Sequence, residues 1–131
     1  MYAREARVMR SVLLTIVFVV LTGQARAELA VTLSTEQITV IETGIQARLK
    51  NPDSAKFSGL VARPINGVVL AVCGYVNAKN SSGSYIGNLA FVGFLSNNDS
   101  WRFSVLAIDD PSRISAQQTC HDWGIVLVAL P

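Results

Sequence analysis

The sequence predicts an α+β domain in which an antiparallel sheet of four to five strands is packed by an N-terminal and a C-terminal helix. Apolar residues recur at helical spacing in one early segment, and four later segments are rich in aromatic and β-branched residues. A helix start signal, Asp110-Pro111, follows the last of these segments. This order of elements is typical of a two-layer domain.

Residues 1–27 have the pattern of a secretory signal peptide. Three arginines precede an apolar run over residues 12–21, and Ala25-Arg26-Ala27 supplies a small-x-small cleavage site. About ten apolar residues fall short of the roughly twenty that cross a bilayer, which disfavours the alternative of an uncleaved anchor. We expect cleavage after Ala27, a single secreted domain over residues 28–131, a periplasmic or secreted location, and no membrane association after cleavage.

The expected mature domain is almost neutral. Of eleven Lys and Arg residues and nine Asp and Glu residues, four and one lie in residues 1–27, which leaves seven basic and eight acidic side chains. The sequence pI of about 8.7 therefore belongs to the precursor. A nucleic-acid partner is not expected, because its binder needs a basic surface that releases counterions from phosphates.

Cys73 and Cys120 are the two cysteines of the chain, and both lie in the expected mature domain. In an oxidising compartment we expect them to form a disulfide. Closing a loop of about 48 residues would destabilise the unfolded chain by roughly 4 kcal/mol in the chain-entropy model. A catalytic or metal-binding cysteine is the less favoured alternative, because two separate thiols and a single histidine make no ligand set.

An amphipathic helix of about fifteen residues is predicted to start after Ser34, which opens an S-x-x-Q capping box with Gln37. Its apolar face comprises Ile38, Ile41, Ile45 and Leu49. We expect Arg48 and Lys50 in the last turn, where cations complement the helix dipole. Asn51-Pro52 should end the helix, and residues 53–56 should add one further turn.

Four strands are predicted next, over Phe57–Arg63, Val68–Val76, Tyr85–Leu95 and Trp101–Ala107. Turns are expected at Pro64–Gly67, with Asn66-Gly67 as a two-residue hairpin, and at Ser96–Ser100. The third strand is apolar on both faces, which predicts a central position. Its glycines, Gly87 and Gly93, indicate bulges or places where a helix packs closely.

A second helix is predicted from Pro111 to about Trp123, with Asp110 as N-cap and Gly124 at C′. Three side chains are expected to face the sheet: Ile114, Cys120 and Trp123. The disulfide would then join this helix to the second strand. Residues 125–130 are apolar and β-branched, so they form either an edge strand, which we favour, or a tail over the core.

Three segments resemble a family of small secreted proteobacterial proteins. The chain has PDSAKF over residues 52–57, VCG-x-VNAKNS over residues 72–81, and a GGY-x-G-like segment in which Ser84 replaces the usual second glycine. The resemblance covers roughly residues 45–95 and implies export and a common fold more than an activity. By size, compartment and disulfide use the chain also looks like the periplasmic inhibitors of lysozyme-type peptidoglycan hydrolases, which is a likeness of class and not of motif.

The sequence gives little indication of an enzyme. His121 and Asp122 are adjacent, so on a helix their side chains point about 100° apart and make no dyad. His121 is expected on the surface, and Asp109 and Asp110 are interpreted as a cap. Nucleophile elbows, phosphate loops and metal-ligand spacings are absent. We therefore expect a protein that is not an enzyme and needs no metal or cofactor.

The least generic stretch is the polar loop between the second and third strands. A hairpin that needs only a turn uses two residues, so this longer loop is either slack or a site. The candidate partner-binding residues are Asn77, Lys79, Asn80, Ser81, Ser82 and Tyr85. A solvated hairpin loop that binds nothing is an equally good interpretation.

The leading functional hypothesis is a periplasmic inhibitor of a lysozyme-like glycosidase, acting through the 77–85 loop. Such an enzyme carries two carboxylates in a sugar-binding cleft. Lys79 would meet these carboxylates, the asparagines and serines would mimic sugar hydroxyls, and Tyr85 would stack at the rim. The alternative is a non-enzymatic accessory protein of the cell envelope, associated with a secretion or conjugation apparatus.

Overall fold

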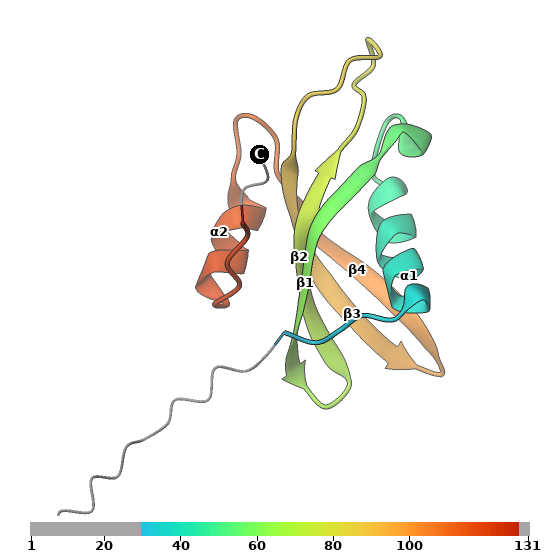
Figure 1. Ribbon diagram of the computed structural model, residues 1–131, viewed down its shortest axis with the longest axis vertical. Helices are drawn as coiled ribbons and strands as arrows, with labels where there is room; N and C mark the ends of the chain where they lie inside the picture. Colours follow the sequence, from blue (N-terminus) through green and yellow to red (C-terminus); the bar gives the residue numbers. More distant parts are fainter. Residues whose placement is uncertain (1–29, 129–131) are drawn as a thin grey trace, which may run out of the picture.

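The structure is a computed structural model that describes residues 30–128. In this part of the chain, four antiparallel strands form one sheet in the order β1-β2-β3-β4, with helix α1 on one face and helix α2 on the other (Figure 1). The predicted α+β class is confirmed, with four strands. The predicted signal peptide lies outside the described residues. No helix within residues 30–128 is long and apolar enough to cross a bilayer.

Helix α1, Thr35–Gln46, begins with the predicted capping box. The Gln37 N–H donates to Ser34 Oγ over 3.2 Å, and the Ser34 N–H donates to Gln37 Oε1 over 2.8 Å. The helix is shorter than predicted, so the placement of Arg48 and Lys50 in its last turn is wrong. The reason is that the N–H groups of residues 48 and 49 bond three residues back, which tightens the chain into a turn.

The 3₁₀ turn η2, Pro52–Ser54, confirms that an extra turn follows α1, but it starts one residue earlier than predicted and ends at Ser54, because Ala55 is extended and Lys56 belongs to β1. Strand β1, Lys56–Asn66, then pairs with β2, Val69–Asn77. The turn predicted at Pro64–Gly67 is wrong in its position, because β1 continues through Pro64 and the chain reverses at residues 67 and 68. Proline is compatible with this position because β1 is an edge strand.

Strand β3, Leu89–Asn98, pairs with β2 and with β4, Ser100–Ile108. The predicted central position of the third strand is confirmed, but its predicted start at Tyr85 is wrong. Residues 85–88 belong to the preceding loop, where the Tyr85 hydroxyl donates to the Ser54 carbonyl.

The turn between β3 and β4 was predicted over Ser96–Ser100, but it consists of Asp99 alone, whose φ is 74°. Gly93 borders a bulge, and a Cβ there would lie 2.5 Å from Phe103 Cζ.

Helix α2, Ser115–Asp122, starts later than predicted, and Asp110 is not its N-cap. Asp110 instead bonds within its own turn, where its Oδ1 accepts from the N–H and the hydroxyl of Ser112. The neighbouring Asp109 caps the helix: its carboxylate accepts from the N–H groups of Ala116 and Gln117 over 2.6 and 3.0 Å. The interpretation of this acidic pair as a cap thus holds for Asp109.

Of the other predictions for α2, those for its C-terminal end are confirmed and the one for Ile114 is wrong. Gly124 has a φ of 73° and follows the C-cap, as predicted. Cys120 is buried and Trp123 packs against the α2 side of the core, whereas Ile114 is 62% exposed, so its expected orientation toward the sheet is wrong. It precedes the first helical residue and is not held on the inner face.

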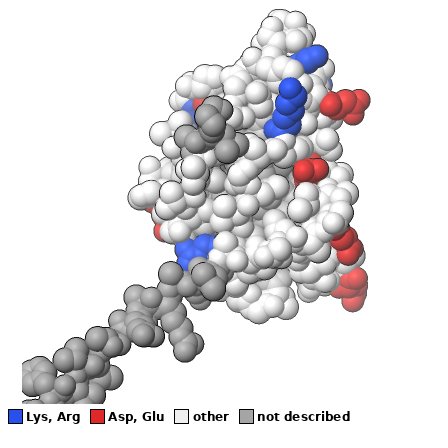
Figure 2. Space-filling view, viewed as in Figure 1, with Lys and Arg blue, Asp and Glu red and all other residues white. Residues whose placement is uncertain are grey.

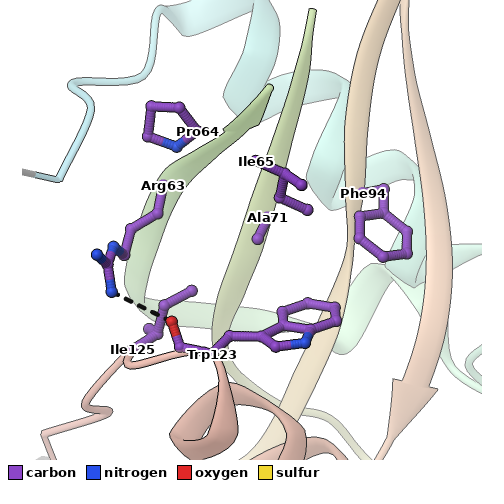
Figure 3. A pocket seen from close by; sticks show the side chains of 7 residues that line it. All are labelled: Arg63, Pro64, Ile65, Ala71, Phe94, Trp123 and Ile125. Carbon is purple, nitrogen blue, oxygen red and sulfur yellow. Dashed lines mark hydrogen bonds between the residues drawn. The ribbon is translucent and has the colours of Figure 1, made fainter. Parts of the chain in front are cut away.

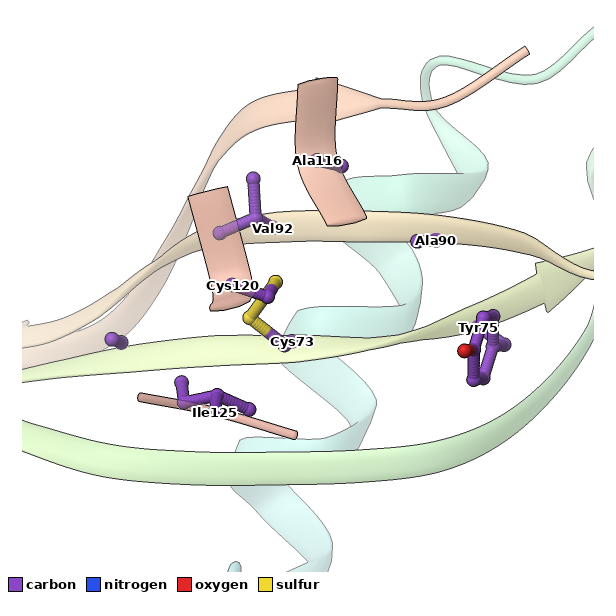
Figure 4. Packing of buried hydrophobic residues seen from close by; sticks show 8 residues of the cluster. Cys73, Tyr75, Ala90, Val92, Ala116, Cys120 and Ile125 are labelled. Atoms are coloured by element: carbon purple, nitrogen blue, oxygen red, sulfur yellow. A yellow bond between two sulfur atoms is a disulfide. The ribbon is translucent and has the colours of Figure 1, made fainter. Parts of the chain in front are cut away.

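The predicted disulfide joins Cys73 on β2 to Cys120 on α2, with an S–S distance of 2.04 Å (Figure 4). After α2 the chain forms a tail rather than the favoured edge strand, at least over residues 125–128. The Ile125 N–H donates to the Cys120 carbonyl, which closes the helix end, and its side chain is buried beside the disulfide. Residues 129–131 lie outside the described part.

Candidate functional site

The β2–β3 connection, which we call the 78–88 loop, extends beyond the sheet at the end opposite the β1–β2 turn (Figure 1). It is longer than the 77–85 loop expected from the sequence, because β3 starts at Leu89. All of its residues from 79 to 88 are at least partly exposed. Position and exposure make this loop accessible to a concave partner.

The tip of the 78–88 loop is closed by its own hydrogen bonds. The Asn80 N–H donates to the Ser84 carbonyl over 2.8 Å, and the Gly83 N–H donates to the Asn80 carbonyl over 3.0 Å. The Asn80 side-chain oxygen also accepts from the N–H groups of Ser82 and Ser84. Side-chain bonds of this kind fix a turn. The loop is therefore ordered by specific contacts and is not slack.

The 78–88 loop is also braced from outside by the η2 turn. Asn51 Nδ2 donates to the carbonyls of Lys79 and Asn80 over 3.2 and 2.7 Å. Ser54 Oγ accepts from the Lys79 N–H over 2.8 Å, and the Ser54 carbonyl accepts from the Tyr85 hydroxyl over 3.0 Å. Two segments that are about thirty residues apart in the sequence thus form one rigid unit.

The candidate residues chosen from the sequence fall into two groups. Asn77 and Asn80 have internal partners: Asn77 Oδ1 accepts from the Gly87 N–H over 3.1 Å, and Asn80 fixes the tip. Ser81 and Ser82 are exposed at the tip, and neither hydroxyl has a hydrogen-bond partner among residues 30–128. The asparagines therefore shape the loop, while the serines remain open to a partner.

Tyr85 is the centre of a small cationic cluster. The Lys56 Nζ lies 4.5 Å from the centroid of its ring, and the Lys79 Nζ lies 5.6 Å from it. These distances are within the range of cation–π attraction. In the described chain, no carboxylate lies within ion-pair distance of either lysine. Tyr85 as a whole residue is 40% exposed, so an incoming group can contact it.

Lys56 was missed in the sequence analysis. It stands at the start of β1, where the sheet register pairs it with Asn77 at the base of the loop. The available signal was its place in the PDSAKF segment, but only the strand pairing shows that this segment lies against the loop. Lys56 therefore joins Lys79 and Tyr85 in the candidate site.

A hollow of about 410 Å³ lies beside this cluster, lined by Asn51, Pro52, Asp53, Ser54, Lys79 and Tyr85. Figure 2 shows Lys and Arg side chains near the loop end of one face, with acidic side chains along one margin. The cluster offers cations, hydroxyls and an aromatic ring, which are groups for recognition.

Within residues 30–128, no three His, Cys, Asp or Glu side chains gather to hold a metal ion. His121 is on the surface, as expected.

The opposite end of the sheet carries a different kind of hollow, about 390 Å³ in volume and mostly apolar (Figure 3). Phe94 and Trp123 lie against each other there, with ring centroids 5.2 Å apart. Arg63 donates to the carbonyls of Trp123 and Gly124 and so ties β1 to the end of α2. The molecule therefore has a cationic polar end and an apolar end.

No family model, curated protein or solved structure matches this chain. The resemblance suggested by the three sequence segments therefore stays a prediction.

Proposed function

We propose that this protein is a secreted, non-enzymatic binding protein that inhibits a lysozyme-type peptidoglycan hydrolase through the 78–88 loop. The observation that carries the proposal is the braced loop, in which the exposed Tyr85 lies beside Lys79 and beside Lys56 of β1, and neither lysine has a carboxylate partner among residues 30–128. A secreted or periplasmic location is part of the proposal, and the disulfide supports it because such bonds persist in oxidising compartments.

The charge pattern of the site matches that of the proposed target. A lysozyme-like enzyme carries two carboxylates on either side of its scissile bond, in a cleft shaped for sugar rings. Lys56 and Lys79 present two ammonium groups to such a pair. Complementary charge speeds association and disfavours partners with a basic surface.

The rigidity of the 78–88 loop also suits a binding role. Ordering a mobile loop at an interface reduces affinity, whereas a loop fixed before binding avoids that loss. Hydrogen bonds from Asn51 and to Ser54 already hold the backbone of this loop. Ser81 and Ser82 at the tip would then take the place of sugar hydroxyls, and Tyr85 would stack at the rim of the cleft.

The decisive experiment adds the purified exported protein to a cell-wall clearing assay with goose-type, chicken-type and bacterial muramidases in turn. We expect stoichiometric inhibition of one class. If none of the three enzymes is inhibited, the inhibitor proposal fails.

Replacing Lys79 with alanine tests the role of the loop. We expect the Lys79→Ala variant to inhibit at least about tenfold more weakly, because interface cations that face desolvated acids are among the residues that dominate affinity. The matched control is Arg102→Ala, which removes an exposed cation from β4. An unchanged inhibition constant for Lys79→Ala would remove this residue from the site.

The second candidate function is an accessory protein of the cell envelope. The observation that favours it is the apolar hollow beside Trp123. Its lining residue Ile65 is exposed, and so is Val126, which follows the lining residue Ile125 in sequence. Exposed apolar surface of this kind is common at protein interfaces. Cross-linking in the periplasm should then recover one stable protein partner, with no effect on muramidase activity.

A further inference from the structure

A third hollow lies where the segment after α1 meets the base of the 78–88 loop. Its volume is about 480 Å³, within the range of small-molecule sites. Residues 48–50 form one wall, and the end of β2, the start of β3 and the loop form the others. This hollow is larger than the one beside Tyr85 and differs from it in chemistry.

The floor of this hollow is apolar. Its aliphatic lining residues are Leu49, Val76, Ala78, Ile86 and Leu89. Val76 and Ala78 are buried, so the apolar surface that a ligand can contact comes mainly from Leu49, Ile86 and Leu89. Ile86 is a large aliphatic residue of the 78–88 loop and is 44% exposed. A bound apolar group would cover Ile86 and remove its surface from water.

The rim of the hollow is cationic. Arg48, Lys50 and Lys79 line it, together with a single acid, Asp110. The Asp110 carboxylate accepts hydrogen bonds from Ser112 within its own turn, and no carboxylate among residues 30–128 pairs with Arg48 or Lys50. The Lys79 ammonium lies beside the Tyr85 ring. Arg48 and Lys50 are therefore the two cations available to a ligand in this hollow.

We propose that this hollow binds a small amphiphilic anion, a single acyl chain that ends in a carboxylate. The chain would lie on the apolar floor, and the carboxylate would meet Arg48 and Lys50 at the rim. Charge complementarity selects this occupant over a neutral lipid, and the apolar floor selects it over a simple inorganic anion. The site does not depend on the proposed inhibition, because the cations that carry it are not those beside Tyr85.

The first test titrates the purified protein with decanoate below its micelle concentration and follows backbone amide shifts by NMR. We expect saturable shifts centred on residues 48–50, 76–80 and 86–89. Decanol, which lacks the charge, and acetate, which lacks the chain, should each bind at least about tenfold more weakly. Shifts that do not saturate, or equal binding of decanoate and either control, would overturn the proposal. So would binding to phosphatidylglycerol vesicles without any binding of free decanoate.

Two variants test separately how the cationic rim and the apolar floor contribute to binding. Arg48→Gln combined with Lys50→Gln should weaken decanoate binding about tenfold and leave decanol binding unchanged, whereas Ile86→Ser should weaken both. The controls are Arg102→Gln and Leu106→Ser, which change an exposed cation and a 54% exposed apolar residue on β4. Equal loss in a variant and its control would overturn the proposal. Muramidase inhibition by the Arg48/Lys50 variant should be unchanged, so the two proposals can fail separately.

Discussion

The two faces of the sheet are held by different means. On the α1 face the buried cluster is made of large side chains, among them Ile41, Ile45, Val72, Phe91 and Leu95. On the α2 face it is made mostly of small side chains around the disulfide, among them Ala71, Ala90, Ala116, Cys73 and Cys120. One helix is therefore stabilised mainly by buried apolar volume and the other mainly by a covalent bond.

Alternate residues of the same strands produce this difference. On β2, Val72 and Val76 face α1, while Ala71, Cys73 and Tyr75 face α2. Helix α2 spans only eight residues, a length that is marginal without tertiary support. Small side chains let α2 approach the sheet closely but bury less apolar surface. A short helix on a face of small residues therefore needs a covalent bond to the sheet, whereas a longer helix on a face of large residues does not.

The largest effect is expected from removing the disulfide. The Cys73→Ala, Cys120→Ala double variant should lose about 4 kcal/mol of unfolding free energy in the chain-entropy model, since the cysteines are 47 residues apart. Hydrogen exchange should show α2 amides losing protection far more than α1 amides. Reduction of the natural protein should give the same pattern. Equal loss in the two helices would contradict the proposed difference between the faces.

The next largest effect is expected on the α1 face. Ile41→Ala should lower the unfolding free energy by about 3 kcal/mol, because Ile41 is fully buried and its truncation leaves a cavity. The matched control is Ile38→Ala on the same helix, where the side chain is only half-buried and the loss should be smaller. Denaturant unfolding measures both. Equal losses would show that burial volume does not dominate this face.

A smaller effect is expected at the cap of α2. Asp109→Ala should reduce the unfolding free energy by about 1 kcal/mol, because the N–H groups of Ala116 and Gln117 lose their acceptor. The control is Asp122→Ala at the other end of the helix, where the exposed carboxylate accepts from the Gln118 side chain and lies 3.8 Å from His121 Nδ1. If thermal unfolding shows that the control costs as much, the cap has no special role.

The smallest effect is expected from Asp110, whose pKa is lowered by the hydrogen bonds from Ser112 and, to a lesser extent, by the charge of Arg113. A lowered folded pKa means that ionised Asp110 favours the fold above its ordinary pKa and loses this contribution as the pH falls through the folded value. An NMR titration should give a pKa below the ordinary aspartate value. In Ser112→Ala the pKa should rise toward that value, and no change would contradict the assignment.

The features that the sequence predicted well have short-range signals. The capping box of α1 lies within four consecutive residues, and Gly124 marks the end of α2 by its own backbone preference. The disulfide followed because the chain holds two cysteines and one possible pairing. Each of these signals lies within a few residues or allows only one pairing, so the sequence alone is enough to predict the feature.

The features that the sequence predicted poorly depend on distant contacts. Residues 85–88 have the composition of a strand, but the Tyr85 hydroxyl bonds to Ser54, 31 residues earlier, which keeps them in the loop. Lys56 reaches the candidate site only through the pairing of β1 with β2. The Asp110-Pro111 signal predicts Asp110 as the N-cap of α2, but Asp109 caps the helix, because the end of β4 places it beside the helix start, seven residues before Ala116. No local pattern contains these relations.

The position of the two cysteines also bears on how the chain acquires its disulfide. Strands β3 and β4 both lie between Cys73 and Cys120, so the whole sheet is synthesised before the second thiol exists. With two cysteines, only one intramolecular pairing is available, so no mispaired disulfide that would need rearrangement can form within a chain. The remaining hazard is intermolecular: until Cys120 reaches the sheet, the Cys73 thiol is a site for covalent dimers. Dilution during oxidative refolding should therefore raise the yield of monomer more than a disulfide isomerase does.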